Sequence, residues 1–284
     1  MSGKISPIAV AKEALSLSWA RKWTFLGLVL LGMIPSLLSA GVGVAFDEPS
    51  GFGGVLGLVV IVLTVLVGLF VLTVFFHLGV TLQRGDGRLI PENCKVAMWR
   101  VFVRGLLLWL VTTGLMLIFM GPIIFLTVSS GAEGGQMESG MAAVGFIAAF
   151  AVLVGFAVSF GVMPRLAVML PGAAVGHVVS LSEAMALTKG HTFRMIGSYL
   201  MIIVPFVALA VLIAGGLGLS SETGLAGVVV AGFFFLFFVF SIFAEIILPM
   251  VNCVWYEKLR LRYDSMNREQ SSMGPSNSER SFNT

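Results

Sequence analysis

One carboxylic acid lies inside a long run of uncharged residues near the end of the chain. Glu245 stands in the segment FSIFAEIILPM, roughly 15 Å along a helix from Trp255 and Tyr256 at 1.5 Å per residue. Pro249 follows four residues later and leaves the carbonyl of residue 245 without its usual backbone donor. A carboxyl group beside a free carbonyl could take up a proton or a cation, or could hydrogen-bond to a neighbouring helix.

Three polar residues in other apolar runs are candidate partners of Glu245. Thr73 and His77 are one helical turn apart in one run, and Ser159 lies in another. Two interpretations stay open. Glu245 could belong to a proton- or ion-coupled site, or it could remain neutral and hold the helices together by hydrogen bonds.

Other patterns that carry chemistry are absent from the sequence. It contains no glycine-rich phosphate loop ending in Lys-Ser/Thr, no His-Glu-x-x-His and no serine nucleophile elbow. The three histidines and two cysteines do not cluster, so we expect no metal site and no disulfide. The prediction is therefore a protein without catalytic residues, cofactor or enzymatic activity.

The composition places these residues in a membrane protein. The chain is 58% hydrophobic and 11% charged, and its mean hydropathy is +1.02 over 284 residues. Because a helix of about 20 apolar residues crosses the hydrocarbon core, continuous runs of this length predict an all-α bundle of transmembrane helices. Six such runs are found, at residues 24–45, 54–81, 103–128, 140–163, 195–219 and 226–253.

The positions of the cations predict the orientation of these spans. Of the 17 Lys and Arg, four precede the first span, five lie at residues 84–104, three at 165–194 and five from residue 258 onward. The other three loops carry only acidic charges. Since Lys and Arg stay on the cytoplasmic side, both termini are predicted to be cytoplasmic in a bacterial inner membrane. The net charge of +3 follows from this bias, so we expect no nucleic-acid partner.

A short pattern recurs in three of the predicted spans. Gly-x-x-Leu-x-x-x-x-Pro occurs at residues 27–35, 114–122 and 197–205, which suggests three parallel units of two spans each; chance matches in apolar sequence are the alternative. Proline removes a helical hydrogen bond, so we expect kinks at four prolines inside spans. These are Pro35, Pro122, Pro205 and Pro249.

Two short amphipathic segments, residues 6–19 and 180–194, precede the first and fifth spans and are called the elbows here. In the first, Ser6 and Pro7 predict a helix start, and apolar residues including Trp19 share a face while Glu13 lies elsewhere. In the second, Ser180 and Glu183 have the spacing of a capping box. The elbows could lie in the inner membrane interface and lead into the spans, or they could bind a partner protein.

The segment RLAVMLPGAAVGHVVSLSEAMALTKGHTFRMIGSYL, at residues 165–200, resembles the YciC-like and glycerophosphodiester-phosphodiesterase membrane-domain-like families of bacterial multi-span proteins. The match includes Ser180, Leu181, Glu183 and Ala184, and WYEKLRLRYD resembles the families' closing element. The resemblance extends over residues 5–262 and implies an inner-membrane helical bundle of undefined role. It supplies no catalytic residues.

These observations predict an integral membrane domain at residues 1–262 and a disordered cytoplasmic tail at 263–284. The expected partners are membrane lipids and a protein at the cytoplasmic face. The favoured function is a non-enzymatic membrane organiser that binds a partner or anionic lipid. The alternative is a carrier or lipid-handling protein with a proton-sensitive site at Glu245.

Overall fold

The computed structural model describes residues 5–45, 51–131, 158, 161–220 and 226–272. Within these ranges every regular element is a helix and no strand is present, which confirms the all-α prediction. Residues 161–167 are helical, whereas most of the run predicted at 140–163 lies outside the described residues. The helices are α1 (Pro7–Ala20), α2 (Lys22–Ala45), α3 (Gly51–Gln83), α4 (Cys94–Gly131), α6 (Met169–Ala174), α7 (Leu181–Leu187), α8 (Thr192–Ser220) and α9 (Ala226–Ser272).

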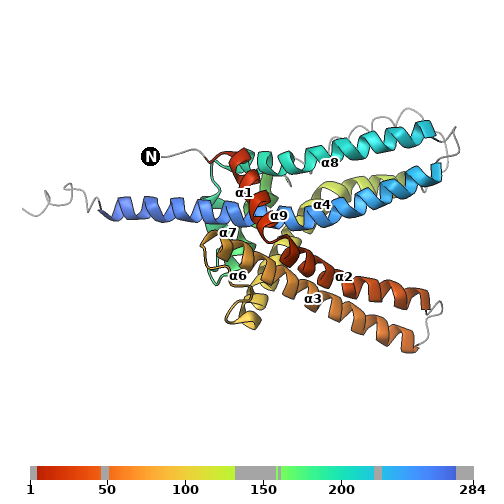
Figure 1. Cartoon of the computed structure of the whole chain (residues 1–284), viewed down its shortest axis with the longest axis horizontal. Helices are drawn as coiled ribbons and strands as arrows, with labels where there is room; N and C mark the ends of the chain where they lie inside the picture. The colour runs from red at the N-terminus through yellow and green to blue at the C-terminus, as the bar shows by residue number, and fades with distance from the viewer. Residues whose placement is uncertain (1–4, 46–50, 132–157, 159–160, 221–225, 273–284) are drawn as a thin grey trace, which may run out of the picture.

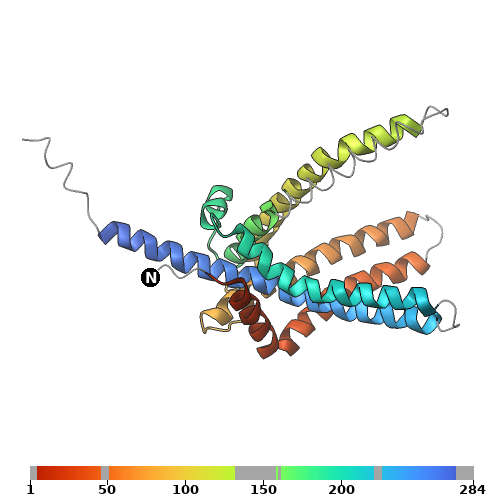
Figure 2. The ribbon, with the colours of Figure 1, turned by 90° about the horizontal axis from the view of Figure 1, so that it is seen from above.

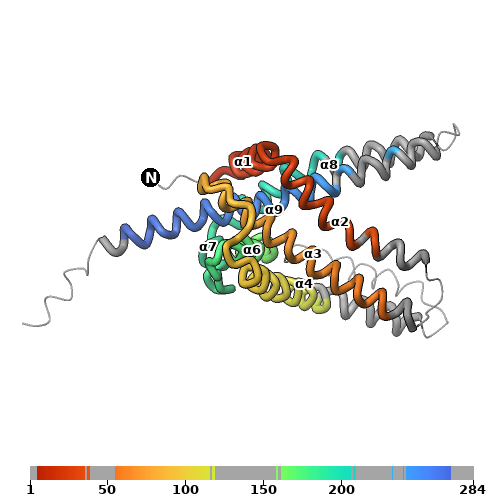
Figure 3. Tube along the Cα trace, turned by 60° about the horizontal axis from the view of Figure 1, so that its bottom comes forward, coloured from red at the N-terminus to blue at the C-terminus, as the bar shows by residue number. Residues whose placement is uncertain are grey.

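The long helices form arms that spread from a shared base (Figure 1). Helix α2 packs along α3, and α8 packs along α9. Helix α4 leaves the base in a third direction, as Figure 2 shows. We call the base the hub: it consists of α1, α6, α7, the adjoining ends of α2, α3, α4 and α8, and residues 247–259 of α9 (Figure 3). Beyond the hub, α9 projects away from the arms.

The hub contains the buried core. Helix α9 contributes the largest share, because its residues 247–259 meet α1, α3, α6 and α8. Phe25 of α2 and Phe75 of α3 pack with ring centroids 4.6 Å apart. The largest fully buried side chains come from six helices and the segment before α6: Val10, Phe25, Val74, Phe76, Val80, Leu166, Met169, Met195, Ile247, Met250, Trp255 and Tyr256.

The arms expose apolar side chains. Ile61, Val62 and Leu63 of α3 are consecutive and all exposed, so more than half of that helix's circumference is apolar and uncovered. Among the described residues, Val55–Gln83 is one helix that could cross a membrane by length and composition, and only 6% of its most apolar window is buried. The bent pair Pro7–Ala20 and Lys22–Pro35 could supply a second crossing. The coarse prediction of an all-helical protein with a helix that could cross a membrane therefore holds.

The elbows fold as two short helices. Helix α1 meets α2 at Arg21 with a bend of 83°, and Ile8, Leu15 and Trp19 are exposed while Val10 and Ala14 are buried. Ser6 is the N-cap of α1, but its side chain makes no capping hydrogen bond.

In the second elbow, the predicted capping box of α7 is present. The amide of Glu183 donates to Ser180 Oγ at 3.2 Å, and the amide of Ser180 donates to Glu183 Oε2 at 3.3 Å. The guanidinium of Arg165 donates to Thr188 Oγ1 and to the carbonyl of Met185, which ties the end of α7 to the helical segment at residues 161–167.

The end of the chain differs from its prediction. A disordered tail is expected from residue 263, but α9 continues as a helix to Ser272; residues 273–284 lie outside the described part. Arg260 pairs with Asp264 at 3.8 Å with the i,i+4 spacing that supports an exposed helix. The helices run through the four predicted kink prolines, Pro35, Pro122, Pro205 and Pro249, and the kinks themselves stay predictions.

A close contact between α6 and α9 gives the first testable prediction. A Cβ added at Gly172 would lie 2.9 Å from the carbonyl oxygen of His177 and 3.0 Å from the ring of Tyr256. Because backbone cannot move aside easily, Gly172→Ala should reduce the free energy of unfolding by about 1–3 kcal/mol, measured by thermal melting in detergent. Gly105→Ala is the matched control, because nothing lies within 4 Å of its added Cβ. Equal melting temperatures of the two variants would contradict this packing.

Candidate functional site

A polar cleft, called the arginine cleft here, opens at the hub between the end of α3, the start of α4 and the turn after α6. Its volume is about 380 Å³. Its floor includes His77 and Thr81 of α3, and both ring nitrogens of His77 are buried without a hydrogen-bond partner among the described residues. The walls include Arg84, Asp86, Arg88, Glu92, Arg100 and Gly176.

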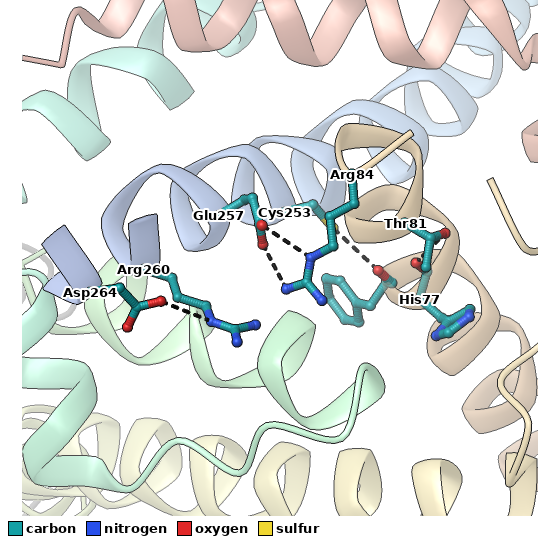
Figure 4. Close-up of polar contacts among 8 residues, drawn as sticks. His77, Thr81, Arg84, Cys253, Glu257, Arg260 and Asp264 are labelled. Carbon is teal, nitrogen blue, oxygen red and sulfur yellow. Dashed lines mark hydrogen bonds and ion pairs between the residues drawn. The ribbon is translucent and has the colours of Figure 1, made fainter. Parts of the chain in front are cut away.

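An ion pair between Arg84, the residue directly after α3, and Glu257 of α9 borders this cleft. Arg84 Nε donates to Glu257 Oε1 at 3.0 Å, and Arg84 Nη2 donates to Glu257 Oε2 at 2.8 Å (Figure 4). The hydrogen bond to Glu257 raises the pKa of the Arg84 guanidinium. The Glu257 side chain is 12% exposed and that of Arg84 is 35% exposed, so solvent screens the pair only partly. Although Arg84 and Glu257 are 173 positions apart in the sequence, their ion pair connects the end of α3 to α9.

Of the other arginines in the arginine cleft, Arg88 is paired with two carboxylates and Arg100 contacts a backbone carbonyl. Arg88 contacts Asp86 at 3.3 Å and Glu92 at 2.6 Å, while Arg100 Nη1 donates to the carbonyl of Gly176 at 3.4 Å. Together with Glu257, three carboxylates balance the three guanidinium groups, so the cleft offers no strong excess charge to a ligand. No group of three or more His, Cys, Asp and Glu residues that could hold a metal ion occurs within the described ranges.

The structure does not bring Glu245 together with Thr73 or His77, the two predicted partners that lie among the described residues. Glu245 is exposed on α9 and makes no hydrogen bond or ion pair with described residues. Thr73 is buried and donates within its own helix to the carbonyl of Leu69 at 2.7 Å. His77 faces the arginine cleft, which no described α9 residue lines, and Ser159 lies outside the described residues.

Sequence reasoning missed a polar network where α8 meets α9. The indole of Trp255 donates to Ser198 Oγ at 2.8 Å, and the hydroxyl of Tyr199 donates to Asn252 Oδ1. Arg262 lies 3.1 Å from His191 Nε2, so the ring accepts this hydrogen bond when it is neutral. The available signal was Asn252 itself, an amide inside an apolar run, because such groups need a partner in lipid.

A second concavity, called the elbow groove here, lies between the α1–α2 bend and α9. Its volume is about 410 Å³. Its lining is apolar except for Ser18 and Lys22, and the Ser18 hydroxyl already donates to the carbonyl of Ala14 at 2.8 Å. The Lys22 ammonium lies 4.3 Å from the ring centre of Trp19 and 5.9 Å from that of Trp23. The main apolar contributors are Leu15, Trp23, Leu26, Ile242, Phe243 and Ile246.

An aromatic residue beside a cation recurs near the hub end of α2, α4 and α8. Lys22 and Trp23 begin α2, Trp99 and Arg100 lie within the first two turns of α4, and Phe193 and Arg194 begin α8. The three aromatic side chains are 75%, 65% and 89% exposed, respectively. Glu13 of the first elbow forms an ion pair with Lys258 of α9 at 2.7 Å, which ties α1 to α9.

Comparisons with known proteins give no assignment. No family model, no curated protein and no solved structure matches the chain. The resemblance to the YciC-like families therefore stays a prediction.

The His191 contact predicts a pH-dependent stability. Burial lowers the pKa of His191 below its ordinary value of 6.5, and repulsion from Arg262 and Arg194 lowers it further. The folded state thus binds fewer protons than the unfolded state, so stability should fall as pH drops from 7.5 to 5. His191→Gln should reduce this loss, measured as the fall in melting temperature. An identical fall in wild type and variant would contradict the role of His191.

Proposed function

We propose that this chain is an integral protein of the bacterial inner membrane that acts as a non-enzymatic organiser and binds anionic lipid at its cytoplasmic face. In this proposal the apolar arms lie in the bilayer. The hub lies at the cytoplasmic surface, and both termini are cytoplasmic. The proposal extends to six transmembrane helices in three pairs; the fourth predicted span, at residues 140–163, lies mostly outside the described residues.

The observation that carries the proposal is the aromatic–cation pair near the hub end of α2, α4 and α8. Exposed Trp23, Trp99 and Phe193 stand beside Lys22, Arg100 and Arg194. Tryptophan is favoured at the headgroup level of membranes, and a neighbouring cation attracts anionic headgroups. Two of the three helices, α2 and α4, therefore carry a tryptophan–cation pair near the hub, and α8 carries a phenylalanine–cation pair, with exposed apolar surface on one side and the charges of the hub on the other.

Two features support the use of a repeated unit. A short helix precedes a hairpin of two long helices twice, as α1 before α2–α3 and as α7 before α8–α9. The recurring Gly-x-x-Leu-x-x-x-x-Pro pattern falls in α2, α4 and α8, which we assign as the outward-going helix of each unit. Three parallel units built in this way would give each arm the same polarity across the membrane.

A carrier function is the second candidate, and the exposed carboxyl group of Glu245, which has no partner among the described residues, favours it. The position of Glu245 along α9, close to the proposed membrane surface, weakens the case for a carrier. Ile242 and Ile246, on either side of Glu245 in the chain, line the elbow groove together with Lys22. The groove that contains Lys22 therefore borders the same stretch of α9, so Glu245 lies near the headgroup region that we assign to Lys22, where a carboxylate reaches water at small cost.

Cysteine labelling tests the topology. With a membrane-impermeant maleimide, native Cys94 should react only after the cells are permeabilised, because it precedes the arm formed by α4. Cysteines placed at Glu48, Glu133 and Glu222 in a Cys94→Ser background should react in intact spheroplasts, because these positions lie in the loops without Lys or Arg. The reverse pattern at any position would contradict six spans with cytoplasmic termini.

Lipid-dependent stability tests the function. The purified protein should melt at a higher temperature in nanodiscs that contain phosphatidylglycerol than in nanodiscs of phosphatidylcholine alone, because a ligand that binds only the folded state stabilises it. Phosphatidylserine should act in the same way, since charge is the shared property. Equal melting temperatures in neutral and anionic nanodiscs would contradict an anionic-lipid organiser, and acceleration of solute uptake into vesicles would favour the carrier.

A further inference from the structure

We propose that the elbow groove is a specific binding site for one anionic glycerophospholipid of the cytoplasmic leaflet. One acyl chain would lie in the groove, and the phosphate would contact Lys22. This inference rests on the proposed membrane function and deepens it, because it replaces a general attraction to anionic lipid with one site.

The shape of the groove follows from the bend between α1 and α2. Helix α1 turns 83° from α2, so the two helices and α9 enclose a concave surface that a straight span could not form. Val239 lines its arm end and Ile247, which is buried in the hub, lines its base. These two residues are about 12 Å apart along α9 at 1.5 Å per residue. That length accommodates a substantial part of an acyl chain.

The lining chemistry suits an acyl chain with a headgroup at one end. Leu15, Leu26, Ile242 and Phe243 offer apolar carbon, and the only other polar side chain, Ser18, has its hydroxyl bonded within α1. Among the described residues of the lining, Lys22 is the only charged one. An acyl chain supplies the apolar partner, and an anionic phosphate supplies the opposite charge.

No described carboxylate competes for Lys22. Glu13, on the same helix as Leu15 and Ser18, contacts Lys258 at 2.7 Å and does not line the groove. Glu245 does not line it either, because helical periodicity turns that residue away from the face of Ile242, Phe243 and Ile246. The Lys22 ammonium, positioned against Trp19, forms no ion pair with described residues. It is therefore available to an external anion.

Fluorescence quenching tests the site directly. A Trp99→Phe, Trp109→Phe background retains Trp19 and Trp23 beside the groove together with the hub residue Trp255. The probe is phosphatidylglycerol with brominated acyl chains, titrated into phosphatidylcholine nanodiscs that contain the protein. We expect half-maximal quenching at a lower mole fraction of this probe than of brominated phosphatidylcholine.

Matched variants separate a site from general surface charge. Lys22→Gln should raise the half-maximal mole fraction about fivefold, the effect expected for one cation near anionic lipid, and Lys22→Arg should restore it. Lys95→Gln removes the same charge from the exposed start of α4, outside the groove, and should change the value less than twofold. Leu26→Phe should lower the extent of quenching because its larger ring occupies the groove.

Three results would overturn the inference. These are equal effects of Lys22→Gln and Lys95→Gln, unchanged quenching in Leu26→Phe, and equal quenching by the two brominated lipids in the background protein. Stabilisation by phosphatidylglycerol that survives both Lys22→Gln and Leu26→Phe would leave the proposed function standing and remove this site. If phosphatidylglycerol does not stabilise the wild-type protein at all, both the proposed function and this site are contradicted.

Discussion

The burial of Trp255 inside the hub is the constraint on which the rest of the structure depends. Its side chain is fully buried, and its indole donates to Ser198 while the Ser198 hydroxyl donates to the carbonyl of Met195. The arms diverge, so the interactions that join one arm to another are concentrated at the hub, around residues 247–259 of α9. An indole in this position needs both apolar contacts and a hydrogen-bond acceptor, and α8 supplies the acceptor. The orientation of α8 against α9 follows from that pairing.

Apolar and polar surfaces are separated along the length of the molecule. The arms expose residues such as Leu58 and Ile61, whereas the described ion pairs lie in the hub or along the extension of α9. In water, arms of this kind would aggregate, and in lipid they need only satisfy their backbone hydrogen bonds, which a helix does internally. The elbow groove lies at the boundary between these regions. A molecule that is itself apolar at one end and charged at the other matches that boundary.

The sequence predicts the local features well and the long-range features poorly. The apolar runs locate α2, α3, α4, α8 and the first part of α9, and the spacing of Ser180 and Glu183 predicts the capping box, because these depend on neighbours in the chain. Three features depend on residues far apart in sequence and have no periodic signal: the Arg84–Glu257 pair, the arginine cleft and the elbow groove. Glu245 and His77 were predicted as partners because polar groups are rare in apolar runs, but the sequence does not reveal which way each side chain faces. The helix beyond residue 263 was missed because a polar segment carries no apolar run, although its i,i+4 charges were present.

The continuity of α9 has a mechanical consequence. This helix extends over 47 residues, about 70 Å, from an arm through the hub to Ser272. From Leu259, the last buried residue of α9, to Ser272 is about 20 Å. Helix α9 can therefore act as a lever that pivots at the hub, with one end in an arm and the other end projecting from the opposite side of the hub. A tilt of about 10° in the arm would displace the far end by roughly 3 Å if the helix stays straight, and Pro249 is where a bend would absorb the tilt instead.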